Sequence, residues 1–265
     1  MRKTKLILLI SLNLLLSNVF GMDSKPVIKV GVGNNCPYFC ESTTDPGYIA
    51  EIIHKATANS PIEVQLILIP ERRITDLLKK GIIDVSVLPS AEIRKDPNLF
   101  SLKARLGVHF LALANLEANE SIQSFSELKG KKVVFSGGEQ HHRVLEQRLK
   151  ELNKSEQSFV ISLTGKNSTK RQKKMLHKKR ADFIVADFNV LSFYNIKDSD
   201  ENMKLNILPS SIGGFTPLVL ASRRTDDFIK NFGEAIASYV KDTRRNGELQ
   251  SILEKYNVSD WKQFY

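Results

Sequence analysis

One pattern occurs twice in this 265-residue chain: the basic end of a helix, then an aspartate, then a short apolar strand. The first copy runs over residues 77–88 (LLKKGIIDVSVL) and the second over residues 175–187 (MLHKKRADFIVAD). Cations in the last turn of a helix compensate the negative end of its dipole, and such apolar runs are typical of strands buried on both faces. The repeat therefore predicts two α/β lobes of similar construction. Because ligands of open parallel sheets bind at the carboxyl ends of the strands, each copy also indicates one wall of a binding site.

The first 21 residues have the features of a secretory signal peptide. Three basic residues precede an apolar run over residues 6–16, and small residues near Gly21 offer a cleavage site. The run is short for a membrane span, which makes a retained anchor the less favoured alternative. We therefore expect residues 1–21 to be removed and the mature chain to be exported to the periplasm.

The chain is basic, with a formal net charge of +10, and much of the excess lies in residues 166–180. A nucleic-acid-binding surface needs aromatic or base-reading side chains beside its cations, and this segment has none. We interpret the segment as the solvated face of a helix and predict no nucleic-acid partner.

Cys36 and Cys40 are the only cysteines. An exported chain permits them to pair, and a separation of four residues allows a disulfide only if the loop turns sharply. A disulfide and two free thiols both remain open at this point. Because no other thiol and no suitable histidine lie nearby in the sequence, we predict no metal site.

Catalytic motifs are absent from the sequence. The pair His141 and His142 with Glu146 does not form the His-Glu-x-x-His metal pattern, and an exposed helix turn explains it better. There is no Gly-x-Ser-x-Gly elbow and no phosphate-binding loop. The sequence thus predicts a protein that is not an enzyme and has no cofactor.

Two long apolar strands are expected to cross between the lobes, at residues 107–114 and 215–221. The second crossing returns the chain to the first lobe, which predicts a first lobe of residues 22–109 and 216–265 and a second lobe of residues 110–215. The tail over residues 226–256 is expected to be helical.

Five short motifs follow one another in an order that resembles the extracellular solute-binding proteins of family 3, which include the periplasmic amino-acid receptors of ABC importers. None is specific alone, but their order extends over essentially the whole mature chain. They are residues 47–53 (GYIAEII), 81–84 (GIID), 126–133 (SELKGKKV), 180–183 (RADF) and 247–256 (GELQSILEKY).

The resemblance implies a periplasmic binding protein-like type II fold, an α/β architecture of two lobes joined by two crossing strands. It implies a monomer that captures a small polar ligand, amino-acid-like or cationic, for the membrane permease of an ABC importer. The alternatives are an enzyme on the same scaffold, similar to cyclohexadienyl dehydratase, and a ligand-sensing partner of a membrane receptor.

The resemblance also implies a ligand site. Arg94, shortly after Ser90 at the end of the first repeat, is similar to the arginine that grips a ligand carboxylate with two parallel hydrogen bonds. Asp187, at the end of the second repeat, matches the position that pairs with a ligand ammonium group. The alternative for Arg94 is an ordinary surface position, and the alternative for Asp187 is the N-cap of the helix that follows it.

Three further residues complete the walls of the expected site. Arg73 resembles an arginine that faces the cleft from the start of the second helix in a looser branch of the family. Tyr38 and Phe39 follow the first strand and could stack on a ligand, although ordinary packing explains them nearly as well.

Glu139 and Gln140 depart from the family pattern, in which amino-acid receptors commonly carry threonines. A carboxylate here repels an anionic group, which favours a cationic or differently oriented ligand over an ordinary acidic or neutral amino acid. On the enzyme alternative, Glu139 is the acid held over the substrate.

Overall fold

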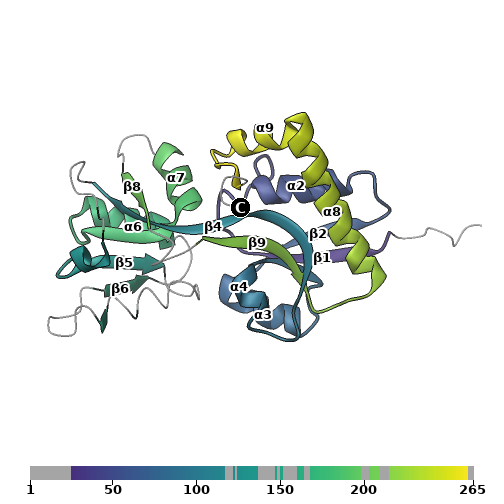
Figure 1. Ribbon diagram of the computed structural model, residues 1–265, viewed down its shortest axis with the longest axis horizontal. Helices are drawn as coiled ribbons and strands as arrows, with labels where there is room; N and C mark the ends of the chain where they lie inside the picture. Colours follow the sequence, from purple (N-terminus) through teal and green to yellow (C-terminus); the bar gives the residue numbers. More distant parts are fainter. Residues whose placement is uncertain are drawn as a thin grey trace, which may run out of the picture.

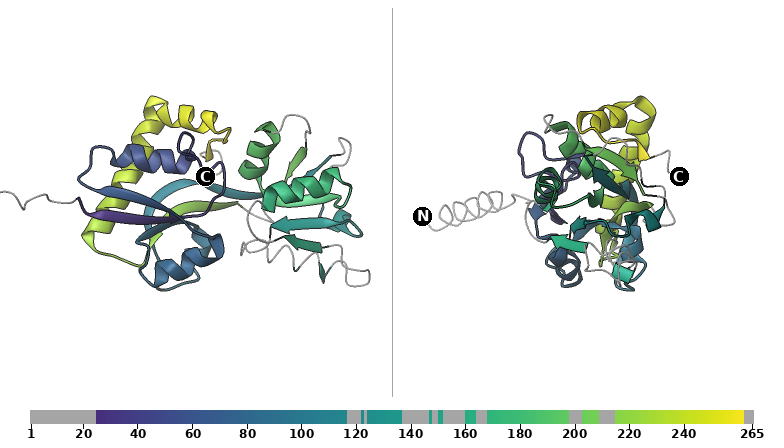
Figure 2. Two further views of the ribbon diagram at one scale, coloured as in Figure 1. Left: turned by 180° about the vertical axis from the view of Figure 1, so that it is seen from behind. Right: turned by 90° about the vertical axis from the view of Figure 1, so that its left-hand side faces the viewer.

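The computed structural model describes residues 25–116, 122, 124–136, 147, 150–151, 160–163, 168–197, 203–208 and 215–261. In this part of the chain, two α/β lobes are joined by strands β4 (Phe100–Asn115) and β9 (Phe215–Ser222), which pair with each other in antiparallel register (Figure 1). The same two strands pass between the lobes when the molecule is seen from behind (Figure 2). The expected type II architecture is confirmed.

The first lobe contains a sheet of order β2-β1-β3-β9-β4. Helices α2, α8 and α9 lie on one side of it and helices α3 and α4 on the other (Figure 1). The elements not yet given are β1 (Val27–Val32), α2 (Tyr48–Thr57), β2 (Glu63–Leu68), α3 (Glu71–Lys79), β3 (Val85–Pro89), α4 (Ser90–Ile93), α8 (Asp227–Asn246) and α9 (Glu248–Lys255).

In the second lobe the sheet continues from the far half of β4 in the order β4-β7-β5-β6. Strand β8 also pairs with β4, in antiparallel register. The elements of this lobe are the 3₁₀ helix η1 (Phe125–Leu128), β5 (Val133–Ser136), β6 (Val160–Leu163), α6 (Ser168–His177), β7 (Phe183–Asp187), α7 (Phe188–Lys197) and β8 (Lys204–Ile207). Each lobe has its own buried apolar clusters, so each has a core to stabilise it.

The repeated helix-to-strand joint has the same backbone geometry in both lobes. After α3, Gly81 has φ 69° and the next residue, Ile82, donates its N–H to Leu77 O (3.0 Å). After α6, the equivalent Lys179 has φ 54°, and Arg180 donates its N–H in the same way to Met175 O (2.9 Å). Both helices therefore end in the left-handed turn that satisfies their last carbonyl groups.

The aspartate of each repeat ties its strand to the neighbouring one. The Asp84 carboxylate accepts a hydrogen bond from the backbone N–H of Lys29 (3.0 Å), and the Asp182 carboxylate accepts one from the backbone N–H of Lys132 (2.7 Å). Each aspartate also donates its own N–H to the carbonyl of that same lysine, at 2.9 Å in both lobes. The repeat is therefore a helix-to-strand unit whose aspartate has a structural role in both lobes.

Two expected element boundaries are wrong. The tail is not one helix, because Gly247 has φ 84° and separates α8 from α9. Strand β4 begins at Phe100 rather than near Gly107, since buried Leu102 and Ala104 alternate there with exposed residues that hide the apolar pattern.

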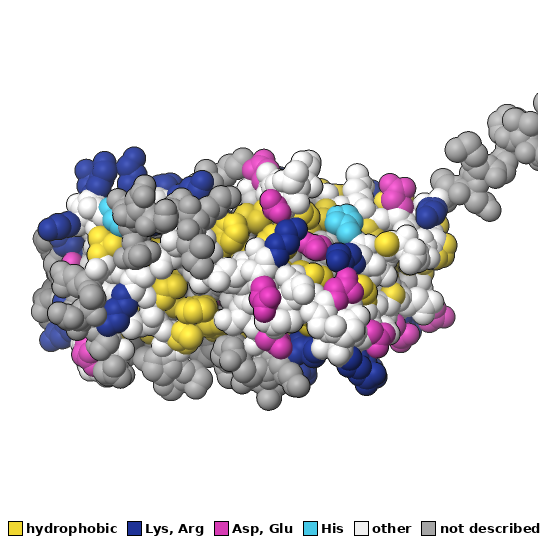
Figure 3. Space-filling view, turned by 90° about the horizontal axis from the view of Figure 1, so that it is seen from above, with side chains coloured by type: hydrophobic (Ala, Val, Ile, Leu, Met, Phe, Trp, Pro, Cys, Tyr) yellow, Lys and Arg dark blue, Asp and Glu magenta, His cyan; other side chains and the backbone are white. Residues whose placement is uncertain are grey.

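No helix among the described residues is long and apolar enough to cross a membrane. Lys and Arg side chains gather over the end of the molecule formed by the second lobe (Figure 3). Helix α6 contributes exposed Lys170, Arg171 and Lys174, as expected for a solvated face, whereas its Lys173 is buried and donates to Tyr194 O (3.4 Å).

Candidate ligand site at the junction of the lobes

A buried carboxylate lies where the two lobes meet. Asp187 ends β7 and is 2% exposed. Its Oδ1 accepts hydrogen bonds from Tyr38 Oη (2.7 Å) and the backbone N–H of Val190 (3.1 Å). Its Oδ2 accepts one from the backbone N–H of Phe110 (3.1 Å), and His109 Nε2 lies 3.6 Å from it. These donors compensate a charge that would otherwise be costly to bury.

Tyr38 comes from the loop after β1, in the other lobe. The loop is closed by a disulfide between Cys36 and Cys40, whose Cα atoms are 4.9 Å apart, and by a hydrogen bond from Asn35 N to Phe39 O (2.8 Å). The pairing that the sequence left open is therefore formed. Burial is the main cause, and the charge of Asp187 the second, that hold the pKa of Tyr38 well above its usual value. The hydroxyl therefore stays protonated and donates a hydrogen bond to Asp187.

Asn189 completes this group, and sequence reasoning missed it. Its Nδ2 donates to Tyr38 Oη (3.0 Å) and, more weakly, to Val108 O (3.5 Å). Its Oδ1 is buried and accepts no hydrogen bond from the described residues. We call Tyr38, His109, Asp187 and Asn189 the junction cluster. The only sequence signal for Asn189 was a polar residue two positions after Asp187, at the start of a helix.

The junction cluster joins four elements: the loop after β1, the crossing strand β4, the end of β7 and the start of α7. Next to it, the rings of Phe110 and Phe188 stack with their centres 4.9 Å apart. Further along α7, Asn257 Nδ2 of the first lobe donates to Ser192 Oγ of the second (3.0 Å). Val190 of α7 also belongs to the same buried apolar cluster as Tyr38 of the first lobe, so the lobes touch along this side through both polar and apolar contacts.

The structure brings together two of the predicted site residues, Tyr38 and Asp187. The alternative role of Asp187 as a helix N-cap is confirmed, because it accepts the N–H of Val190 at the third position of α7. Its pairing with a ligand ammonium group stays a prediction. An incoming cation would have to share the carboxylate with Tyr38 or displace it.

The other described residues of the predicted site do not belong to the junction cluster. Phe39 is buried in the core of the first lobe, which agrees with the alternative that it only packs in the core. Ser90 begins α4 and its Oγ lies 3.5 Å from Nη1 of exposed Arg94, a long contact. Arg73 is exposed in α3, and its side chain makes no hydrogen bond or ion pair within the described part of the chain.

Glu139 and Gln140, like His141, His142 and Glu146, lie outside the described residues. Within the described residues, no group of three or more His, Cys, Asp and Glu side chains is arranged to hold a metal ion.

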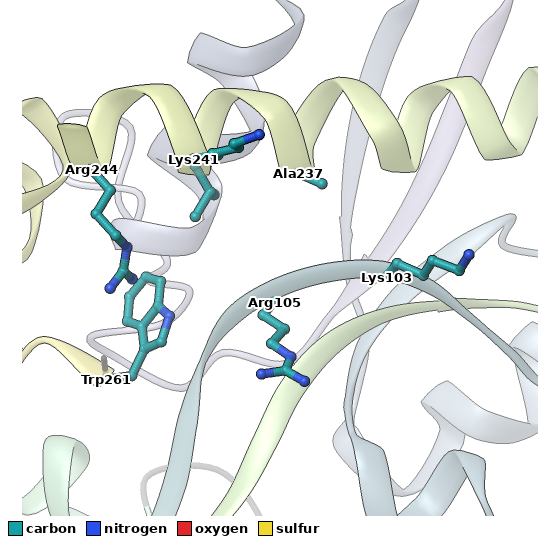
Figure 4. A pocket seen from close by; sticks show the side chains of 7 residues that line it. Lys103, Arg105, Ala237, Lys241, Arg244 and Trp261 are labelled. Atoms are coloured by element: carbon teal, nitrogen blue, oxygen red, sulfur yellow. The ribbon is translucent and has the colours of Figure 1, made fainter. Parts of the chain in front are cut away.

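A separate groove of about 320 Å³ lies on the first lobe between β4 and α8 (Figure 4). Its lining shares no residue with the junction cluster. It is formed by Lys103, Arg105, Ala237, Val240, Lys241, Arg244 and Trp261.

No protein-family model and no curated protein matches this sequence. Solved structures match its fold over most of its length. One, reported for glutathione import through the cystine ABC importer of Streptococcus mutans, has a TM-score of 0.70 at 15% identity, covering 88% of this chain and 95% of the other.

Two proteins described as ancestral are similar in the same way. An ancestral arginine-binding protein bound to arginine has a TM-score of 0.60 at 22% identity, covering 87% of this chain and 97% of the other. An ancestral amino-acid-binding protein, a precursor of cyclohexadienyl dehydratase, has a TM-score of 0.63 at 18% identity, covering 87% and 95%. The chain therefore has the two-lobed fold of periplasmic solute-binding proteins. At these identities the likeness establishes the fold and leaves the ligand to the chemistry of the site.

Proposed function

We propose that the chain is an exported solute-binding protein that captures a small polar, amino-acid-like or cationic ligand between its lobes and delivers it to the membrane permease of an ABC importer. The fold supports this proposal, since similar structures come from an ABC import system and from an arginine-binding protein. The observation that carries it is the junction cluster, a buried polar group made by residues from both lobes.

The chemistry of the junction cluster favours a ligand that donates hydrogen bonds. The proton of the Tyr38 hydroxyl is directed at Asp187, and the carboxylate itself only accepts. Asn189 Oδ1 adds a buried acceptor that no described donor satisfies. Such an atom is costly unless water or a ligand supplies the missing donor. An ammonium, guanidinium or amide N–H is the matching group.

The other end of the ligand is assigned from the sequence. We propose that Arg94, with Ser90 beside it, holds a carboxylate where the ligand has one, and that Arg73 lies at the edge of the same site. Glu139 and Gln140 would face this end from the second lobe. A glutamate there disfavours a second acidic group on the ligand and suits a cationic side chain.

The test is a binding screen with the mature chain, lacking residues 1–21, against amino acids, polyamines and short peptides. We expect one chemical class to raise the melting temperature and to give saturable heat in calorimetry. Asn189→Ala should weaken this binding about tenfold, because one buried hydrogen bond to a charged donor is lost. The control Asn206→Ala removes an amide of the second lobe whose Nδ2 is buried and has no hydrogen-bond partner among the described residues. This change should leave the affinity unaltered.

A second pair of variants tests the carboxylate end. Arg94→Gln should weaken binding of a ligand that has a carboxylate, whereas Arg180→Gln, which removes an exposed charge of the second lobe, should not. If no member of the panel shifts the melting temperature, the proposal is wrong. Equal effects of Arg94→Gln and Arg180→Gln would remove Arg94 from the site.

An enzyme on the same scaffold is the second candidate, favoured by the similarity to a precursor of cyclohexadienyl dehydratase. On this hypothesis Glu139 is the general acid. Turnover of prephenate or arogenate that Glu139→Gln abolishes would support it, and the absence of turnover by the intact chain would reject it.

A further inference from the structure

The groove between β4 and α8 has a strongly positive lining. Of the seven described residues that form it, four are Lys or Arg and none is acidic. Ala237, Val240 and Trp261 provide an apolar floor. We call this site the basic groove. Figure 4 shows that its cations come from two elements, Lys103 and Arg105 from the strand and Lys241 and Arg244 from the helix.

One of these cations is held in place by its neighbours. Arg244 Nη1 forms an ion pair with Asp260 Oδ1 (3.1 Å), and its guanidinium carbon lies 5.2 Å from the centre of the Trp261 ring. Trp261 is itself 4% exposed and packs against Tyr48. Contacts of this kind reduce the side-chain entropy that a bound ligand would otherwise have to offset.

The backbone on the opposite side of the basic groove is unusual. Three described residues other than glycine have positive φ, and two of them, Lys179 and Asn257, follow the ends of helices. Lys103 (φ 62°) is the third, and it lies inside a strand. A left-handed conformation is ordinary at a helix end but costs free energy within a strand.

The strand is irregular at the same place. The register of β4 against β9 shifts between Ser101 and Arg105 and again between Arg105 and Gly107. Irregularities of this kind redirect side chains and are frequent beside functional sites. Here the distorted segment is the one that carries both cations of the strand.

From the charge, the concave shape and this distortion together, we infer that the basic groove is a binding site for a multivalent phosphate-type oxyanion, either free in solution or carried as the headgroup of an anionic lipid. Ammonium and guanidinium groups donate charge-assisted hydrogen bonds to such an anion from both sides. The apolar floor keeps water from one side of the ligand and strengthens these contacts. This site is separate from the proposed solute site, and neither proposal depends on the other.

The experiment uses the mature chain at low ionic strength and pyrophosphate as the soluble probe, followed by calorimetry. We expect one saturable site. The double variant Lys103→Gln/Lys241→Gln should weaken it about tenfold or more, because two charge-assisted contacts are lost. Both lysines are exposed, so the substitutions should leave the fold intact. The matched control Lys80→Gln/Lys178→Gln removes the same charge from exposed positions outside the groove and should not change the affinity.

Vesicles distinguish the two sources of the anion. A lipid headgroup is identified if the protein co-sediments with phosphatidylglycerol vesicles but not with phosphatidylcholine vesicles. The variant Lys103→Gln/Lys241→Gln should then lose this co-sedimentation and the control Lys80→Gln/Lys178→Gln should keep it. Pyrophosphate binding without vesicle binding identifies a soluble ligand.

Two results would overturn the inference: no saturable binding of either probe, or equal losses in the groove variant and the control, which would indicate a diffuse effect of net charge. A third readout separates the sites. Tyr38→Phe, at the junction cluster, should leave pyrophosphate binding unchanged, and loss of binding in that variant would place the anion between the lobes instead.

Discussion

Replacing Tyr38 by Phe tests the junction cluster as a contact that stabilises the arrangement of the two lobes. The change deletes one hydroxyl and leaves the ring in the core of the first lobe. It removes a short hydrogen bond to a carboxylate that is 2% exposed, and it removes the nearer acceptor of the Asn189 amide.

The magnitude follows from these partners. A hydrogen bond to a buried charge contributes about 1.5–3 kcal/mol, and a neutral bond such as that from Asn189 contributes about 1 kcal/mol. After the substitution, Asp187 keeps the two backbone donors, and Asn189 keeps only Val108 O at 3.5 Å. We therefore expect a loss of about 2.5–4 kcal/mol in the free energy of unfolding, or about 5–15 °C in melting temperature for a chain of this size.

The matched control is Tyr239→Phe. The Tyr239 hydroxyl donates to Glu248 Oε1 (2.9 Å), but both residues belong to the first lobe and Glu248 is partly exposed and also paired with Lys55. Because water can replace the lost donor there, the expected cost is about 0.5–1 kcal/mol.

Differential scanning calorimetry of both variants measures the difference, and hydrogen exchange localises it. The amides of Val190 and Phe110, which donate to Asp187, should exchange faster in Tyr38→Phe and at the wild-type rate in Tyr239→Phe. A Tyr38→Phe protein that melts within about 2 °C of the wild type would refute the argument, because 2 °C corresponds to roughly 1 kcal/mol or less.

Two further predictions concern the stability of the single lobes. Lys179→Gly should raise the free energy of unfolding by about 1 kcal/mol, because Lys179 has φ 54° and glycine adopts this conformation without strain. In the same urea titration, the neighbouring Lys178→Gly should lower the free energy of unfolding. If both variants were less stable than the wild type, the role of the left-handed turn would be contradicted. The second concerns acid stability. A hydrogen bond from Arg224 holds the pKa of Asp226 below its usual value, so the stabilisation from this pair is fully present above the unfolded-state pKa of about 3.9 and is lost as the pH falls below it. Arg224→Gln should therefore lower the urea midpoint at pH 7 and make the midpoint decrease less steeply between pH 4 and pH 2.5. If this decrease were as steep as in the wild type, the pair would not contribute to acid stability.

The order of strands and helices could be predicted from the sequence because its signals are local. The apolar run after each repeat, the left-handed glycine at position 81 and the two crossing strands all follow from patterns within a dozen residues. The boundaries that were wrong also have local causes. Gly247 interrupts an apolar stripe that continues on both sides of it, and the exposed cations Lys103 and Arg105 interrupt the start of β4.

The site was less predictable because it is made by contacts distant in the sequence. Tyr38 and Asp187 are 149 residues apart, and no local pattern indicates that their side chains meet. The sequence identified Asp187 from the resemblance and Tyr38 from its position after the first strand, but it assigned each to a ligand rather than to the other. Asn189 had no assignment at all, since an asparagine in the first turn of a helix is commonplace.

The two copies of the repeat differ where the strands end, and this difference is where the function should lie. The aspartates inside the repeat, Asp84 and Asp182, do the same structural work in both lobes, each binding the backbone of the neighbouring strand. The residues after the strands are under no such constraint. The first copy continues to Ser90, which is half-buried at the start of α4, whereas the second ends in Asp187, buried and bound by a tyrosine of the opposite lobe. A ligand that binds at this junction has to compete with the chain's own hydroxyl for the carboxylate. Its affinity should therefore depend on the strength of the Tyr38 bond, so that Tyr38→Phe, while it lowers stability, should strengthen the binding of a cationic ligand that reaches Asp187.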